Sequence, residues 1–217
     1  MTRTCGMMSG HNSAVELEPG YATLRRQIEA GRAAARRGPL DLVTRVPVVV
    51  HIVQAAGAPP VTDQQVQEQL TVLNDDFRGR NADRHDQTPA EFRPFMSDPL
   101  IEFALATRDP AGRQTTGIVR RQTTIQRFPQ AQPPSDRQRI EFIDRELKLD
   151  GTGSTAWAAS DYLNLWVCDM GMDPLGYAAF PGSSSWRDGV VIDVASFGSS
   201  GTARAPFNLG RTSTHEV

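Results

Sequence analysis

The chain has 217 residues, of which 39% are hydrophobic and 22% are charged, and this composition excludes a disordered or fibrous protein. A formal net charge of −2 and the lack of a basic stripe interleaved with aromatic residues argue against a phosphate-binding surface, so we expect no nucleic-acid partner. No apolar run approaches the roughly 20 residues that a membrane span needs, so we expect no membrane association either.

The first 44 residues differ from the rest. Up to Arg45 the chain carries seven arginines against four acidic residues. Residues 21–37 have the pattern of a short helix rich in Ala and Arg, which ends at Gly38-Pro39. We interpret residues 1–44 either as a solvated N-terminal extension or as a pro-segment joined to the following domain by a cleavable basic linker.

A regular pattern begins at Arg45. Residues 45–54 (RVPVVVHIVQ) are β-branched and largely apolar on both faces, which predicts a central strand. A capping box follows at residues 62–65, and Val66, Leu70, Leu73 and Phe77 recur at helical spacing. Residues 62–78 are therefore predicted to form an amphipathic helix.

Several shorter strands are expected beyond this helix. Residues 101–107 alternate between apolar and other side chains, and we expect them to turn at Asp109–Gly112 and return through Gly117–Arg121. A Pro-rich loop at 127–138 then precedes a polar segment. Further strands are predicted at 162–168, 176–180 and 189–193, followed by a helix at the end of the chain. This order predicts an α+β fold in which a mixed sheet is backed by helices.

The final helix carries His215 and Glu216. A zinc peptidase places two histidines one helical turn apart so that both imidazoles face one cation, with the intervening glutamate acting as general base. Only the first two positions of that motif are present. The pair alone does not decide between a zinc ligand and an ordinary surface or core histidine.

Seven segments in chain order extend the comparison beyond this pair: VPVVVHIV, TDQQVQEQLTVLNDDFRGRNAD, IEFALATRDPAGRQTTGI, YLNLWVCDMG, LGYAAFPG, DGVVIDVASFG and NLGRTSTHEV. Together they closely resemble the pappalysin family of metzincin zinc metallopeptidases, over residues 45–217. The resemblance implies the N-terminal subdomain of a zincin-like catalytic domain, with a twisted mixed sheet, a backing helix and the start of the active-site helix.

The same resemblance assigns roles to the terminal pair. The family motif H-E-x-x-H-x-x-G-x-x-H makes His215 the first zinc ligand and Glu216 the general base. The second and third histidines are expected four and ten residues after His215, so we expect the chain to be a fragment of a precursor that lacks two ligands. We expect this fragment neither to hold zinc tightly nor to cleave peptides. The resemblance also allows calcium as a further cofactor.

Two more segments acquire a role from the resemblance. Residues Gly176, Tyr177, Ala178, Ala179 and Phe180 resemble the cleft-edge strand along which a peptide or protein substrate pairs through its main chain. Cys5 resembles the cysteine of latent zymogens, whose thiolate blocks the zinc; the alternative is a free cysteine in a terminal extension. Removal of the pro-segment is then expected near Arg36, Arg37 or Arg45. The family also implies a secreted protein.

The remaining candidates receive structural interpretations. His51 is predicted to be satisfied within its strand, His85 to be exposed in a loop, and His11 to lie in a flexible start. Cys168 is expected to pack as a small hydrophobic residue or to pair with a cysteine outside this chain.

Asp75 and Asp76 are neighbours in a predicted helix and cannot face one site together, so we expect both to lie at the solvated surface of the helix.

Two rival interpretations of the whole chain stay open. One is a non-catalytic peptide-binding module, and the other is a cytoplasmic protein with a solvated Arg-rich helix at its start.

Overall fold

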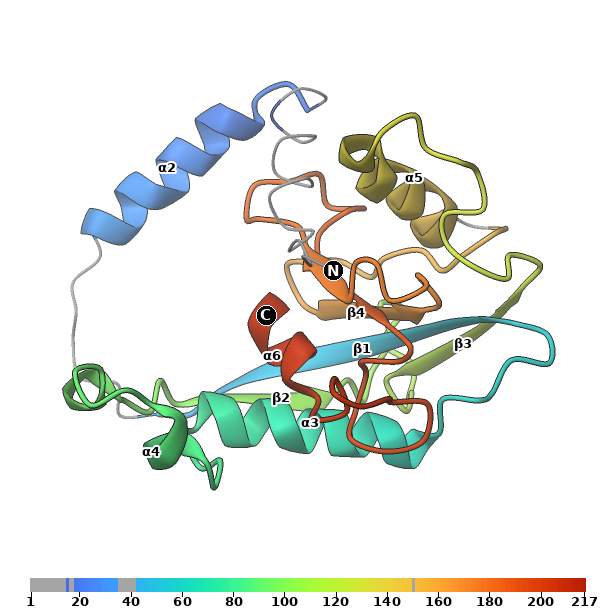
Figure 1. Ribbon diagram of the computed structural model, residues 1–217. Coiled ribbons are helices and arrows are strands. Elements are labelled where there is room, and N and C mark those ends of the chain that lie inside the picture. The colour runs from blue at the N-terminus through green and yellow to red at the C-terminus, as the bar shows by residue number, and fades with distance from the viewer. Residues whose placement is uncertain (1–14, 16–17, 35–41, 150) are drawn as a thin grey trace.

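The computed structural model describes residues 15, 18–34, 42–149 and 151–217 (Figure 1). The expectations for Cys5, His11, Arg36 and Arg37 lie outside these residues. The helices and strands run in the order α2 (Tyr21–Ala34), β1 (Thr44–Ala55), α3 (Asp63–Phe77), α4 (Arg84–Gln87), the 3₁₀ helix η1 (Arg93–Phe95), β2 (Ile101–Leu105), β3 (Ile118–Thr123), α5 (Asp136–Lys148), β4 (Leu163–Cys168), β5 (Gly176–Ala178), β6 (Val190–Asp193) and α6 (Arg211–Glu216).

The sheet has six strands in the order β2-β1-β4-β6-β5, and β3 also pairs with β1. All pairings are parallel except that of β5 with β6. The long β1 lies at the centre, and its residues 48–53 are all buried. This confirms the predicted mixed sheet with an apolar central strand, and it leaves β5 as an edge strand that is paired on one side.

Helices cover both faces of the sheet (Figure 1). On one face, Val66, Leu70 and Leu73 of α3 pack against alternate residues of β1, β4 and β6. On the other face, the apolar residues of α5 pack against Trp166, Val191 and Tyr177. Because side chains alternate along a strand, successive residues of β4 and β6 supply the two cores in turn. The fold is therefore a three-layer arrangement with a single sheet in the middle.

Most predicted elements are confirmed, including the capped helix. Thr62 accepts a hydrogen bond from the backbone of Gln65 at 3.1 Å and begins α3. The strand expected at Gly117–Arg121 is present as β3, but the expectation that it returns alongside β2 is wrong. The chain does turn at Asp109–Gly112, but only the bridge between Arg108 and Gln114 is antiparallel, and β3 then pairs in parallel with β1.

The helix α5 was not predicted from the sequence. Its surface is rich in charge, and its buried hydrophobic residues, Ile140, Ile143 and Leu147, form a single narrow stripe. Among the described residues, no helix is long and apolar enough to cross a membrane.

Candidate active site

The predicted terminal helix is α6, which lies between α3 and the edge of the sheet formed by β5 and β6. It begins after Gly210, whose φ of +69° is in the left-handed region that favours glycine. A side chain at this position would also come within 3.2 Å of Val72 on α3. Gly210 therefore lets the chain turn sharply into α6 while its backbone touches α3.

One face of α3 holds α6 in place. Gln69 donates a hydrogen bond to the carbonyl oxygen of Gly210 at 3.0 Å. Asp76, two turns further along, accepts a hydrogen bond from Thr214 at 2.7 Å and forms an ion pair with Arg211 at 3.1 Å. The expectation that Asp76 solvates the helix is therefore wrong, because its side chain is only 8% exposed and anchors the first and fourth residues of α6.

The same face of α3 also fixes the loop that leads to α6. Gln65 donates to the carbonyl oxygen of Phe197 at 2.7 Å and to the hydroxyl of Thr202 at 2.8 Å. The side-chain oxygen of Gln69 accepts from the backbone N–H of Gly198 at 2.7 Å. Both glutamines are buried, so these bonds replace water that the loop backbone cannot reach. Sequence reasoning missed them, although their spacing places them on one helical face.

Glu216 points into the protein at the end of α6. Its residue exposure is 8%, and its Oε2 atom has no hydrogen-bond partner among the described residues. Burial raises the pKa of this carboxyl group, while the neighbouring His215 lowers it. An unpaired buried carboxylate is costly, so its presence points to a functional group awaiting a proton or a cation.

Glu216 reaches the cleft-edge strand because Gly176 lacks a side chain. A Cβ atom at Gly176 would lie 3.1 Å from Cγ of Glu216 and 2.9 Å from Cδ1 of Ile192. The glycine therefore permits the close packing of α6 on β5. This contact brings together two of the predicted site segments, the terminal pair and the edge strand.

His215, next to Glu216, is exposed. An exposed imidazole beside a buried carboxylate suits a zinc ligand beside a general base. Within the described part of the chain, however, no three His, Cys, Asp or Glu side chains gather into a group that could hold a metal ion. The described residues thus supply at most one ligand of a zinc site, and such a site would need further donors.

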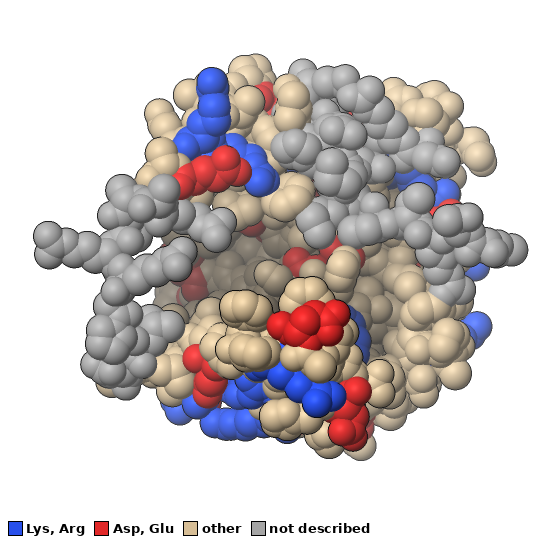
Figure 2. Space-filling model, turned by 60° about the vertical axis from the view of Figure 1, so that its left-hand side comes forward, with Lys and Arg blue, Asp and Glu red and all other residues tan. Residues whose placement is uncertain are grey.

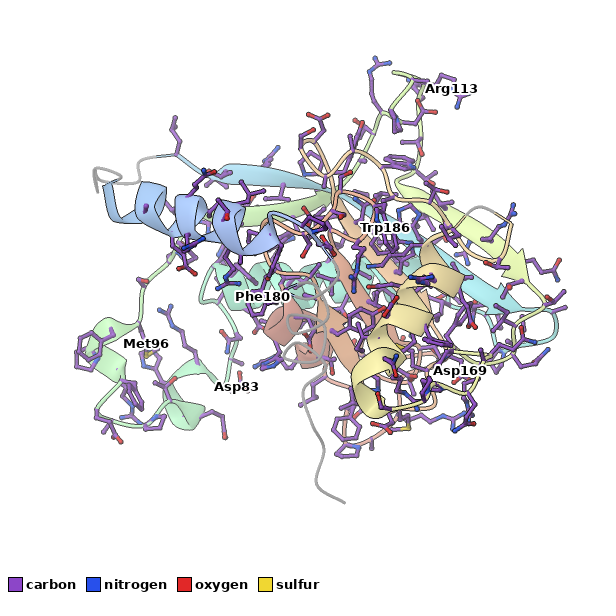
Figure 3. All side chains as sticks on the ribbon, turned by 90° about the horizontal axis from the view of Figure 1, so that it is seen from above. Asp83, Met96, Arg113, Asp169, Phe180 and Trp186 are labelled. Atoms are coloured by element: carbon purple, nitrogen blue, oxygen red, sulfur yellow. The ribbon has the colours of Figure 1, made fainter. Side chains whose placement is uncertain are left out.

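The predicted cleft-edge strand is shorter than expected. β5 ends at Ala178, although the backbone N–H of Ala179 still donates to the carbonyl oxygen of Gly189 at 3.1 Å. Phe180, labelled in Figure 3, lies beyond the strand. The guanidinium carbon of Arg25 in α2 lies over its ring, 4.3 Å from the centroid. The five residues therefore form a short strand followed by an extension that contacts the N-terminal segment.

That segment makes further contacts just after β5. Glu18 binds Ser184 and Arg187, and a Cβ atom at Gly182 would lie 3.6 to 3.8 Å from residues Leu24, Arg25 and Ile28 of α2. Figure 2 shows the side of the molecule on which α2 and α4 lie, and the surface is hollowed there. Acidic and basic side chains gather above and below this hollow. The N-terminal helix therefore lies beside the segment expected to bind substrate.

The histidine predicted to be structural is confirmed as such. His51 is fully buried, lies 2.8 Å from the Ser154 hydroxyl and 3.1 Å from Oδ1 of Asn164, and stacks on Trp166 with 5.0 Å between centroids. Burial lowers its pKa to about 4, against the opposing effect of the Asn164 bond. His51 is therefore neutral in the folded protein at neutral pH.

The other two structural assignments also agree with the structure. His85 is exposed, although it lies in the short helix α4 and not in a loop. Cys168 is a free and fully buried thiol whose pKa is raised by burial, so it packs in the core as a small hydrophobic residue.

A cavity of about 520 Å³ opens at the carboxyl ends of the parallel strands. No residue of β5 or α6 lines it. Its buried acid, Asp193, already accepts hydrogen bonds from the backbone of Met170, Met172 and Ala195 at 2.7 to 3.0 Å. This carboxylate therefore stabilises the backbone of the loops around it. The cavity is separate from the candidate active site.

Nine chains of solved structures match this chain, and three of them are described here. Mature mirolysin of Tannerella forsythia in complex with a cleaved peptide is 41% identical, with a TM-score of 0.72, over 82% of this chain and 62% of that one. A promirolysin variant of the same organism, in which a glutamate is replaced by alanine, is 37% identical, with a TM-score of 0.80, over 98% of this chain and 66% of that one. Mirolysin in complex with a small compound is 39% identical, with a TM-score of 0.70 and coverages of 82% and 62%.

This chain therefore spans 62% to 66% of the length of the mirolysin chains that it matches. No protein-family model matches it, and no curated protein does. The shared fold confirms the predicted fold class.

Proposed function

We propose that this chain, which has the fold of the metzincin metallopeptidase mirolysin, is the N-terminal part of a zinc-dependent endopeptidase made as a latent precursor. The observation that carries the proposal is Glu216, a buried carboxylate that lies against the edge strand beside an exposed histidine and keeps one oxygen without a partner among the described residues. We further propose that the chain belongs to the pappalysin branch of the metzincins, because its sequence motifs resemble those of that branch.

Each residue of the site has a distinct role in this proposal. His215 holds zinc through an imidazole nitrogen, together with histidines expected four and ten residues later. When bound, zinc polarises the peptide carbonyl and makes water acidic enough to react near neutral pH. Glu216 accepts a proton from the attacking water at its free oxygen and passes it to the leaving amine.

The edge strand orients the substrate. β5 pairs with β6 on one side only, so its other edge can form main-chain hydrogen bonds with an extended peptide. The packing of Gly176 on Glu216 keeps this strand at a fixed place relative to the base. The mature mirolysin structure, which contains a cleaved peptide, supports a peptide substrate for this chain as well.

Latency is supported by the difference between two matches. Promirolysin aligns with 98% of this chain and mature mirolysin with 82%. The difference is 16% of 217 residues, or about 35 residues. This length is close to that of the N-terminal segment, which we assign as a pro-segment over residues 1–44. A block of zinc by Cys5 and export from the cell are further parts of the same proposal.

The complete reading frame tests this function. The full protein, once freed of its N-terminal segment, should hydrolyse unstructured peptides, lose that activity with a zinc chelator and regain it when zinc is added. The 217-residue chain, assayed beside it, should hydrolyse none. If the complete protein bound peptides without cleaving them under any of these conditions, it would be a non-catalytic peptide-binding module instead.

A further inference from the structure

The turn that follows the cleft-edge strand contains a receptor for a carboxylate group. The backbone N–H and the hydroxyl of Ser184 donate to Oε2 of Glu18, at 2.6 and 2.8 Å. Nη1 of Arg187 donates to Oε1 of the same glutamate at 3.0 Å. Three donors therefore bind both oxygens of one carboxylate, and charge-assisted hydrogen bonds of this kind are among the strongest in proteins.

The receptor is built into the body of the protein and does not depend on Glu18. The side chain of Arg187 is only 6% exposed, and its Nε donates to Asp144 of α5 at 2.9 Å. Asp144 is held in turn by the hydroxyl of Tyr177 and by the buried Lys148, each at 2.8 Å. The guanidinium group thus keeps its orientation when its other partner leaves.

Ser184 is fixed by the turn itself. Its carbonyl oxygen accepts hydrogen bonds from the backbone N–H groups of Arg187 and Asp188, at 2.8 and 3.2 Å. These bonds set the direction of the Ser184 backbone N–H. Preformed donors lower the cost of binding, because few groups must be ordered when a carboxylate arrives.

The receptor adjoins the strand that is expected to bind substrate. Tyr177, which supports Asp144, is the central residue of β5. Ala178 and Ala179 line one small cavity together with Ser183 and Arg187. A peptide extended along the open edge of β5 therefore passes close to the receptor.

We infer that Ser184 and Arg187 form a specificity site for an acidic side chain of the peptide substrate, which Glu18 occupies in the precursor. This inference rests on the proposed function. Glutamine has nearly the same shape as glutamate, but it would turn an N–H group toward at least one donor of the receptor. A site built to bind a particular polar group rejects analogues that leave its own groups unpaired.

Matched peptides test the specificity. The complete enzyme, freed of its N-terminal segment, is given peptides that differ only in Glu or Gln at one position, and each position is varied in turn. At one position Glu should raise kcat/KM by roughly tenfold over Gln, a ratio that corresponds to about 1.4 kcal/mol. Ser184→Ala should reduce this ratio severalfold, whereas Ser185→Ala, which alters the exposed neighbouring serine, should preserve it.

A binding measurement separates this inference from the proposed function. A labelled peptide of residues 15–34 should bind the same enzyme at least tenfold more tightly with Glu18 than with Gln at that position, as measured by fluorescence anisotropy. Equal binding, together with peptide cleavage that shows no Glu preference, overturns the inference and leaves the proposed peptidase standing. Preferential binding without cleavage of any peptide overturns the peptidase and, with it, the substrate role of the receptor.

Discussion

The C-terminal helix α6 and the N-terminal helix α2 lie on the same body, but they are held there by different means. Gln65, Gln69 and Asp76 hold α6 and its loop, and all three belong to a helix whose other face is part of the core. Among the described residues of α2, only Tyr21 is a buried hydrophobic residue, and the other contacts include the cation–π contact of Arg25 with Phe180.

This difference suits the two roles proposed above, which are a catalytic helix for α6 and part of a pro-segment for α2. A catalytic helix must keep its geometry through every turnover, and α6 should open only when the whole domain unfolds. A pro-segment must leave, and α2 should open alone, because the preceding Glu18 and a few other contacts hold it to the body. The predictions below test whether the two ends behave in these separate ways, in order of decreasing effect.

The largest effect is expected at the end of α6. Glu216→Gln in the complete enzyme removes the proposed general base while keeping the size of the side chain, so kcat should fall by about 10² to 10⁴-fold. Steady-state kinetics on a defined peptide measures this loss. Glu91→Gln, at an exposed position remote in sequence, should leave kcat within a factor of two. A comparable loss in both variants would remove Glu216 from the mechanism.

The anchoring of α6 by α3 is tested with two glutamines on one helix. Gln69→Ala leaves the N–H of Gly198 and the carbonyl of Gly210 without their partner, and it should lower the free energy of unfolding by about 3 kcal/mol. Gln64→Ala alters an exposed side chain and should change it by less than about 0.5 kcal/mol. Urea unfolding of the 217-residue chain compares the two; equal values would contradict the anchoring role.

Acid should lower the free energy of unfolding of the domain that contains α6, but it should not change the free energy of the local opening of α2. The folded pKa of His51 is about 4, below its ordinary value of 6.5, so the unfolded chain binds the proton more readily between these pH values. The contribution of His51 to stability is therefore present above pH 6.5 and is lost as the pH falls toward 4, by up to about 3 kcal/mol.

Hydrogen exchange at pH 7 and pH 5 measures this effect. Protection of α6 should fall with the global stability, whereas protection of α2, which opens alone, should stay constant. In His51→Gln the part of the pH dependence that comes from His51 should disappear. Protection of α2 that falls in step with α6 would mean that the two ends open together.

The smallest effect is expected for the ion pair of the N-terminal segment. Glu18→Gln should increase the exchange rates of the α2 amides roughly tenfold, because it leaves Arg187 without one buried charged partner, and it should leave α6 unchanged. Glu29→Gln is the matched control, since Glu29 pairs with Arg25 of the same helix and is 54% exposed. Such exposed pairs contribute little, so this change should alter exchange by less than about threefold.

The sequence predicted the strands and α3 well because their apolar residues recur at clear periods, as in Val66, Leu70 and Leu73. It failed for α5, whose narrow apolar stripe follows a Pro-rich loop, and for the pairing of β3, whose partner is β1 and not the strand before the nearby turn. The periodicity of apolar residues therefore identified elements with a wide buried apolar face. It missed features that depend on partners far away in the sequence.

The candidate site shows the same division. His215, Glu216 and the segment from Gly176 were proposed as site residues through the motifs that they form, and their roles stay predictions. Gln69 and Asp76 were not, because a polar residue on a helix has the same sequence pattern whether it meets water or a buried backbone group. Arg187 was missed for the same reason, since its partners lie 43 and 169 residues away in the chain.

The zinc content of three forms of the complete protein tests the central claim most directly. Wild-type protein and Glu216→Gln should each hold one zinc ion per chain by elemental analysis, and only the wild type should hydrolyse peptides. His215→Ala should retain little zinc and no activity. Zinc bound equally well by His215→Ala, or peptide hydrolysis undiminished in Glu216→Gln, would contradict the assignment of this pair as metal ligand and general base.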